Sequence, residues 1–374
     1  MSDQIKLINH SSIQINSDDC NLLTDPWYSG SAFNNGWSLL YENDTESIKK
    51  ILSKINHIFI SHEHPDHFSI NFFKDYEKII KTNDIKIIFQ SSNDKRVEKF
   101  LKNMQFSMII LDDKERYEIA DKKFITIFKQ GHIDSALLFE TEEFYHLNIN
   151  DCNFPKHVLC CSSVCLENHR FLDVAFRIKN SLKKEFLEIK NFIKNVKKKI
   201  IIYIQFSYAS FRANDEWLKK AALYKLNNIK NVSKIFNSSL IIPFASFFSF
   251  SHSENQHLKK FANTSSIVKI FLDQNDINHC FLNPNMDLVN LNKILNKDFN
   301  QKKINSESIS FWDDKIKKAK INYFELNPIH INEENIKTFL LRIKKNNNLF
   351  LMHLIRLIFF KKIFGDLTIK INGN

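Results

Sequence analysis

Apolar residues recur at every second position through much of the first 150 residues, a pattern that predicts β-strands. The alternation over residues 5–30 predicts three strands, the last of which ends at Asp25-Pro26. Further strands are predicted at residues 57–60, 86–90, 107–111, 123–129, 136–140 and 144–149. Apolar residues at helical spacing predict helices over residues 45–55, with a threonine cap at Thr45, and over residues 92–104.

Beyond Asp151 the pattern changes to an alternation of helix and strand. Helices are predicted at residues 179–198, 214–236 and 255–272, and strands at residues 200–205 and 240–244. This order predicts an α/β protein of two sheets covered by helices. We expect residues 1–285 to form one domain. Residues 286–374, which are richer in Lys and Asn, are expected to form a small C-terminal appendage of unknown role.

The composition limits the classes of partner. The chain has 374 residues, with 53 Lys and Arg against 42 Asp and Glu and a net charge of +11. Only seven of the basic residues are Arg, in a chain crowded with Asn, Ile and Phe, which indicates drift from an AT-rich genome rather than a nucleic-acid surface. We therefore expect no nucleic-acid partner, and the charge favours a small anionic substrate.

The sequence also favours one compartment. It opens without a charged and then apolar leader, and no apolar run reaches the roughly 18 residues of a membrane span. Three of the six cysteines, Cys160, Cys161 and Cys165, crowd into one segment, unlike the spacing of a secreted disulfide framework. We therefore expect a reduced cytoplasmic protein.

The strongest chemical signal follows the predicted strand at residues 57–60. His62, His64, Asp66 and His67 lie within six residues. The end of a strand can direct the side chains of positions i and i+2 toward one point, and the following turn can direct Asp66 and His67 toward a second point. Imidazole and carboxylate groups are good ligands for zinc, iron and manganese. The pattern predicts a metal centre, and the alternative is a solvated polar turn.

Two later residues fit this centre. His132 follows the predicted strand at residues 123–129, and Asp151 follows the one at residues 144–149. His132 would complete a site of three histidines with His62 and His64. A carboxylate from Asp151 could bridge two metals. Each residue alone is a weak signal, but their order after the histidine motif is a strong one.

This order resembles the metallo-β-lactamase superfamily over about residues 5–275. The resemblance implies an αββα sandwich of two mixed sheets, with the metals at one edge of both sheets. It also implies that His62, His64 and His132 hold the first metal. Asp66 and His67 would hold the second, with Asp151 between the two. Zinc is the expected metal at both positions, and iron or manganese is the alternative.

Four short segments resemble one branch of this superfamily. INHSSI at residues 8–13 and LLTDPW at residues 22–27 resemble the branch with ascorbate-phosphate lactonases and the phospholipase D that cleaves N-acyl phosphatidylethanolamine. AFNNGW at residues 32–37 and IPFASF at residues 242–247 point most toward the metal domain of CMP-sialic acid hydroxylase, a member of the same branch.

The chain departs from this pattern in two ways. The superfamily's last histidine would follow the strand at residues 240–244, where no histidine stands. His252 is our candidate for that ligand, and His257 and His279 are weaker ones. A Rieske centre needs paired Cys and His ligands. The residues before the histidine motif contain one cysteine, Cys20, so we expect no Rieske-type hydroxylation by this chain alone.

These observations favour a metal-dependent hydrolase. A metal-bound water, ionised near neutral pH, would attack an ester, a lactone or a phosphodiester, with Asp66 and Asp151 as catalytic carboxylates. Aromatic residues near Trp27–Trp37 and Ala245–His252 would suit a sugar or nucleotide-sugar substrate from surface-glycan metabolism. The rival hypotheses are a diiron, oxygen-dependent oxidoreductase and a non-catalytic metal-binding protein of glycan assembly.

Weaker signals have plainer explanations. The cluster of His157, His169 and the three crowded cysteines is more often a set of buried thiols than a zinc site. The basic run over residues 183–199 is typical of a solvated helix face. Residues 349–364 could contact a membrane surface but are more often a core helix. Asn9 and His10 either contact substrate or form a buried polar turn, and Asp25 is expected to orient the metal loop.

Overall fold

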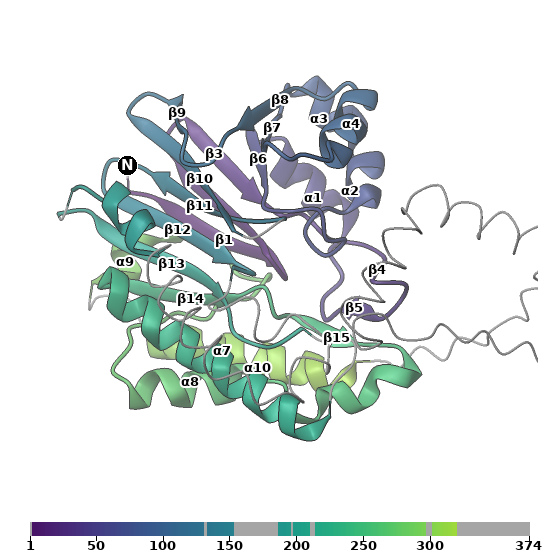
Figure 1. Cartoon of the computed structure of the whole chain (residues 1–374), viewed down its shortest axis with the longest axis vertical. Helices are drawn as coiled ribbons and strands as arrows, with labels where there is room; N and C mark the ends of the chain where they lie inside the picture. Colours follow the sequence, from purple (N-terminus) through teal and green to yellow (C-terminus); the bar gives the residue numbers. More distant parts are fainter. Residues whose placement is uncertain are drawn as a thin grey trace, which may run out of the picture. The chain divides into compact units, whose positions relative to one another are not determined.

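The computed structural model describes residues 2–130, 133–152, 186–195, 197–209, 214–296 and 301–319. Within these residues two large sheets carry helices on their outer faces, as Figure 1 shows. This architecture is the predicted αββα sandwich. No helix among the described residues is both long enough and apolar enough to cross a membrane.

The first sheet has seven strands in the order β16-β1-β2-β3-β6-β7-β8. Strands β1 to β3 are antiparallel, whereas β3, β6, β7 and β8 run parallel. The strands are β1 (Gln4–Asn9), β2 (Ser12–Ser17), β3 (Cys20–Thr24), β6 (His57–Ile60), β7 (Lys86–Gln90), β8 (Met108–Leu111) and β16 (Val289–Asn290).

The second sheet has six strands in the order β14-β13-β12-β11-β10-β9. Strands β9 to β12 form an antiparallel meander, and β12, β13 and β14 are parallel. Their bounds are β9 (Arg116–Ala120), β10 (Lys123–Gln130), β11 (Asp134–Glu140), β12 (Phe144–Asn150), β13 (Lys199–Gln205) and β14 (Leu240–Phe244). A small third sheet, ordered β15-β5-β4, joins β15 (Phe248–Phe250), β5 (Trp37–Leu39) and β4 (Ser31–Ala32).

Four helices cover the outer face of the first sheet. They are α1 (Thr45–Leu52), α2 (Ile70–Asp75), α3 (Glu77–Thr82) and α4 (Arg96–Asn103). Buried residues of these helices, such as Leu52 and Phe72, pack with Ile58 and Ile60 of β6 in one apolar cluster. The cap of α1 is Asp44 rather than Thr45, because the Asp44 carboxylate accepts a hydrogen bond from the backbone N–H of Ser47.

The other helices lie on the side of the second sheet (Figure 1). They are α7 (Asp215–Phe236), α8 (Ser265–Gln274), α9 (Leu291–Leu295) and α10 (Gln301–Lys318), with the 3₁₀ helix η2 (Ser253–Phe261) before α8. Trp312 of α10 is fully buried and stacks on Phe247 with 3.8 Å between ring centroids. Helices α9 and α10 therefore add to the main core. The boundary at residue 285 stays a prediction, because residues 320–374 lie outside the described chain.

The main core fills the space between the two large sheets. Leu7 and Ile15 from the first sheet pack in the same cluster as Ile125, Leu137 and Ile202 from the second. Burying such a side chain contributes about 1.5–3 kcal/mol to folding. The two sheets are thereby held in a fixed relation to each other.

This packing brings several chain segments to one edge of the sandwich. The C-terminal ends of β3 and β6 lie there because the two strands are parallel, and the turn between β1 and β2 lies beside them because β2 is antiparallel to β3. The end of the second sheet reaches the same place, since the backbone N–H of Ala245 donates to the backbone carbonyl of His10 at 2.7 Å. Polar residues from both sheets meet at this edge.

Candidate metal centre

The loop after β6 is held from several sides at Ser61. The Ser61 backbone N–H donates to the Asp25 carboxylate at 2.7 Å. Its backbone carbonyl accepts hydrogen bonds from the side chains of Gln90 at 3.0 Å and Ser135 at 2.6 Å. These contacts join β3, β7 and β11 and fix the start of the loop that carries the histidine motif.

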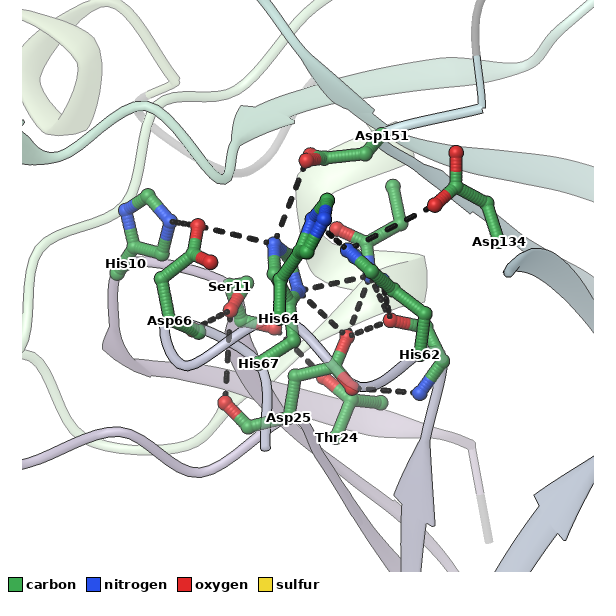
Figure 2. A network of polar contacts seen from close by, with 12 residues as sticks. His10, Ser11, Thr24, Asp25, His62, His64, Asp66, His67, Asp134 and Asp151 are labelled. Atoms are coloured by element: carbon green, nitrogen blue, oxygen red, sulfur yellow. Dashed lines mark hydrogen bonds and ion pairs between the residues drawn. The ribbon is translucent and has the colours of Figure 1, made fainter. Parts of the chain in front are cut away.

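One group of candidate ligands forms around His62. Its Nε2 lies 2.8 Å from Nδ1 of His64 and 3.7 Å from Oδ1 of Asp134 (Figure 2). His62 and Asp134 are buried, and His64 is half-buried. Two imidazole nitrogens and a carboxylate oxygen that converge in this way can hold one metal ion.

A second group forms around His67. Its Nε2 lies 3.2 Å from Oδ2 of Asp66 and 3.5 Å from Oδ2 of Asp151, and Oδ2 of Asp66 lies 3.4 Å from Nε2 of His10. Neither His67 Nε2 nor His10 Nε2 makes a hydrogen bond, although both are buried. Ligands about 2.1 Å from a common ion in tetrahedral geometry lie about 3.4 Å from each other. The three distances therefore fit the ligands of an ion.

Residues behind this group keep the imidazole of His67 in place. An Asp25 carboxylate oxygen lies 3.2 Å from Nδ1 of His67, the nitrogen that faces away from Asp66. The Asn150 side-chain amide donates to the Asp25 carboxylate and, at 2.7 Å, to the Ser61 hydroxyl. A carboxylate bonded to the distal nitrogen of a metal-binding histidine fixes its orientation, so the structure places Asp25 where the sequence suggests an orienting residue.

The charges of the site favour the binding of a cation. Burial disfavours the charged form of Asp66, yet the positive charge of His67 holds the pKa of Asp66 well below its usual value. Burial raises the pKa of Asp151 as well, but the positive charge of His67 lowers it, and the net pKa is below its usual value. Burial, together with the charge of His67, lowers the pKa of His62 to about 4.

His67 supplies the compensating charge in this structure. Burial alone would lower its pKa, but the carboxylates of Asp66 and Asp151 raise it well above the usual value. These shifts favour ionised carboxylates of Asp66 and Asp151 beside a protonated His67. A divalent cation would replace that proton and neutralise more of the charge, so the donor set fits a metal.

The structure brings together five of the predicted ligands, His62, His64, Asp66, His67 and Asp151. His132 lies outside the described residues. Of the residues that the structure describes, none of the candidate groups includes His252, whose Nδ1 accepts from the backbone N–H of Glu254 at the start of η2.

The weaker candidates for the last ligand are also elsewhere. His257 is exposed and contacts the backbone carbonyl of Glu254 at 3.1 Å. His279 is buried against the backbone carbonyl of Ile277 at 2.8 Å. The cluster of cysteines at residues 160–165 and the segment at residues 349–364 lie outside the described residues.

Two residues at this edge were not predicted as ligands. Asp134 opens β11 two residues after His132, and its proximity to the histidine was the only available signal. His10 was expected to contact substrate or form a buried turn, and the structure places its ring nitrogen near Asp66.

Comparisons with known proteins agree with this fold. Residues 4–153 match the model of the beta-lactamase superfamily domain. A possible metal-dependent hydrolase from Veillonella parvula DSM 2008 has a similar structure, with a TM-score of 0.51, 12% identity and coverage of 78% of this chain and 100% of that one. At this identity the likeness shows the fold. The chain therefore has the metallo-β-lactamase fold of metal-dependent enzymes, and residues 4–153 match the domain of that superfamily.

The chain is also similar in sequence to a group of named hydroxylases. The human inactive cytidine monophosphate-N-acetylneuraminic acid hydroxylase is 26% identical over 299 residues, which cover 76% of this chain and 52% of that protein. The corresponding hydroxylase of Asterias rubens is 39% identical over 66 residues, or 18% of this chain and 10% of that protein. The resemblance to this branch is thereby confirmed, and the chain spans about half the length of the human relative.

Proposed function

We propose that this protein is a metal-dependent hydrolase that cleaves an ester, a lactone or a phosphodiester. The observation that supports it most is the convergence of buried histidines and ionised carboxylates at one edge of the sandwich, with spacings that suit metal ligands. When bound, divalent metals at this edge would polarise the scissile bond and lower the pKa of a water to near neutral.

Each residue of the site would have its own role. His62 and His64 would hold the first metal, with His132 as the predicted third ligand, and Asp66 and His67 would hold the second. Asp151 would lie between the metals and accept a hydrogen bond from the attacking water. Its side chain is 17% exposed against 2% for Asp66, so it is the carboxylate that substrate and water reach more readily.

The neighbouring aromatic residues suggest the shape of the substrate. Phe33, which is 39% exposed, lies with its ring centroid 5.7 Å from that of His64 and 4.6 Å from that of Trp37. Trp37 in turn stacks on Phe248 of β15. Flat aromatic surfaces beside a cationic site would suit an anionic substrate with a sugar or nucleotide ring, as expected from the sequence.

A second candidate is an iron-dependent oxidoreductase. Two observations favour it. His62, His64 and Asp134 form a set of two histidines and one carboxylate, which is a common ligand set of non-haem iron. In addition, the curated relatives are named hydroxylases. Both candidates use the same edge of the sandwich and differ in the metal and the co-substrate.

Reconstitution separates the two candidates. Chelator-treated protein is reloaded with Zn²⁺, with Mn²⁺ or anaerobically with Fe²⁺, and assayed on bis(p-nitrophenyl) phosphate, p-nitrophenyl acetate and a simple lactone, with oxygen consumption followed in parallel. We expect metal-dependent hydrolysis that falls at least about 100-fold in Asp151→Ala. The control Asp287→Ala, which removes an exposed acid outside the candidate groups, should leave it unchanged. Oxygen consumption with iron and no hydrolysis with any metal would favour the oxidoreductase instead.

A further inference from the structure

The turn between β1 and β2 contains a buried histidine that the proposed mechanism does not use. The His10 side chain is 1% exposed and lies at the edge where the metal ligands meet (Figure 2). Its φ of +20° is at the border of the left-handed region, which residues with a Cβ rarely adopt. Backbone strain of this kind persists where the surrounding structure enforces it, and it is concentrated at functional sites.

The surroundings of His10 do enforce its conformation. Its backbone N–H donates to the Asn9 side chain at 2.8 Å, and its carbonyl accepts from the Ala245 N–H at 2.7 Å. The Asn9 amide is held in turn by the backbone carbonyl of Tyr41 at 2.9 Å. The turn is thus fixed by the segment after β5 and by the end of β14, and it holds the imidazole in one position.

The ring of His10 has aromatic neighbours but no hydrogen bonds. It makes edge contacts with Trp27 and Phe248, at centroid distances of 5.5 and 5.7 Å. Neither of its ring nitrogens has a hydrogen-bond partner, and the same is true of Oδ1 of Asp66 and Nε2 of His67. Buried polar atoms are nearly always paired in folded proteins, so the unpaired Nε2 atoms of His10 and His67, which both approach Oδ2 of Asp66, indicate a missing ligand.

The spacing of these atoms identifies what is missing. Nε2 of His10 lies 3.4 Å from Oδ2 of Asp66, and the same oxygen lies 3.2 Å from Nε2 of His67. One ligand atom from each of the three residues lies within 4.8 Å of the others. The two printed separations are close to the roughly 3.4 Å between tetrahedral ligands of one ion.

We infer that His10 is a ligand of the second metal, in place of the histidine that this chain lacks at the end of β14. The inference rests on the proposed function, since it assumes a second metal beside Asp66 and His67. The second position then has two imidazoles and a carboxylate of its own, with Asp151 shared with the first. The opening strands of the sandwich would thus supply a ligand as well as core packing.

Metal binding tests this assignment without reference to turnover. Apo protein is titrated with Co²⁺, followed by its visible absorption, and bound Zn²⁺ is measured by elemental analysis after equilibrium dialysis. We expect the parent to bind two equivalents. His10→Ala should keep the first and bind the second at least tenfold more weakly, and His10→Gln, which keeps the bulk of the side chain, should behave in the same way. Circular dichroism verifies that each variant is folded.

Two other histidine variants complete the comparison. His279→Ala removes a buried histidine outside the candidate groups and should bind both metals as the parent does. His252→Ala tests the ligand that the sequence suggests. Two tightly bound metals in folded His10→Ala or His10→Gln would overturn the inference, as would loss of the second metal in His252→Ala alone. A parent that binds no metal would instead overturn the proposed function.

Discussion

Asp25 is a buried residue that connects the end of β3 with the loop of the histidine motif. Its carboxylate accepts hydrogen bonds from the backbone N–H and the hydroxyl of Ser61 at 2.7 and 2.8 Å, and lies 3.2 Å from His67 Nδ1. Its φ of +36° is unusual for a residue other than glycine. These contacts align the end of β3 with the loop after β6.

Asp25→Ala should therefore weaken metal binding about 10- to 100-fold, the usual cost of losing a residue that orients a ligand. The imidazole of His67 and the backbone of Ser61 would both lose their acceptor. Competition with a metal indicator gives the affinity. Asp25→Asn, which keeps one oxygen acceptor, should fall between the parent and Asp25→Ala. Parent-like affinity in Asp25→Ala would show that the loop holds its shape without this carboxylate.

At the scale of single residues, the sequence indicates the histidine motif clearly, because its four candidate ligands lie within six residues of the chain. His10 and Asp134 were missed as ligands for a different reason. Their positions depend on how the two sheets pack, and the spacing of residues along the chain does not indicate this packing. The choice of His252 assumed that the loop after β15 folds back over the site, whereas the structure begins η2 at this point.

At the scale of elements, the periodic strands were the most predictable part. The predicted strands at residues 57–60, 86–90 and 240–244 match β6, β7 and β14 at both ends. Their burial on both faces gives continuous apolar runs.

The sequence pattern did not predict the short or irregular elements correctly. Helices α2 and α3 have six residues each, too few for a clear helical period. The helix predicted at residues 255–272 is interrupted, since Thr264 caps α8 and separates it from η2. The helix predicted at residues 179–198 ends at residue 192 in its described part.

An ion pair links the chain start to β12 across 143 positions of sequence. Nε2 of His146 lies 2.8 Å from Oδ2 of Asp3, which also accepts from the hydroxyl of Thr141 at 2.6 Å. Burial alone would raise the pKa of Asp3, but the hydrogen bond and charge of His146 lower it below the usual value. The first strand is thereby tied to the second sheet.

Asp3→Ala should lower the free energy of unfolding by about 1–3 kcal/mol at neutral pH, because it leaves Nε2 of the buried His146 without its partner. The pKa of Asp3 is lower in the folded than in the unfolded chain, so its stabilising effect is full above about pH 4 and is lost as the pH falls through the folded value. Urea unfolding between pH 7 and pH 3 should show the difference from the parent shrinking toward the acid end. A difference that is absent at pH 7 would contradict this role.

At the scale of the whole molecule, α10 joins the main core through Trp312 and Ile309. Trp312 is fully buried, stacks on Phe247 and donates its indole N–H to the backbone carbonyl of Leu282 at 2.8 Å. The Lys- and Asn-rich composition of residues 286–374 suggested an appendage. In the structure, Asn305, Ser308, Ile309 and Trp312 of α10 are buried.

Trp312→Ala should therefore cost about 3–5 kcal/mol of unfolding free energy, as expected for a buried aromatic residue. Ile316→Ala on the same helix is the matched control. Ile316 is 39% exposed, and its replacement should change stability by no more than about 0.5 kcal/mol. Equal effects of the two substitutions in urea unfolding would mean that α10 does not depend on this contact.

The metal content of the protein decides whether this edge of the sandwich binds metal ions. Chelator-treated chain is reloaded with Zn²⁺, dialysed and measured by elemental analysis beside His62→Ala, His64→Ala and the exposed-histidine control His257→Ala. We predict about two metals per chain in the parent and in His257→Ala, and at least one fewer in the other two variants, because a site that loses one of its few ligands chelates poorly. A parent without bound metal, or His62→Ala and His64→Ala variants with parental stoichiometry, would contradict this prediction.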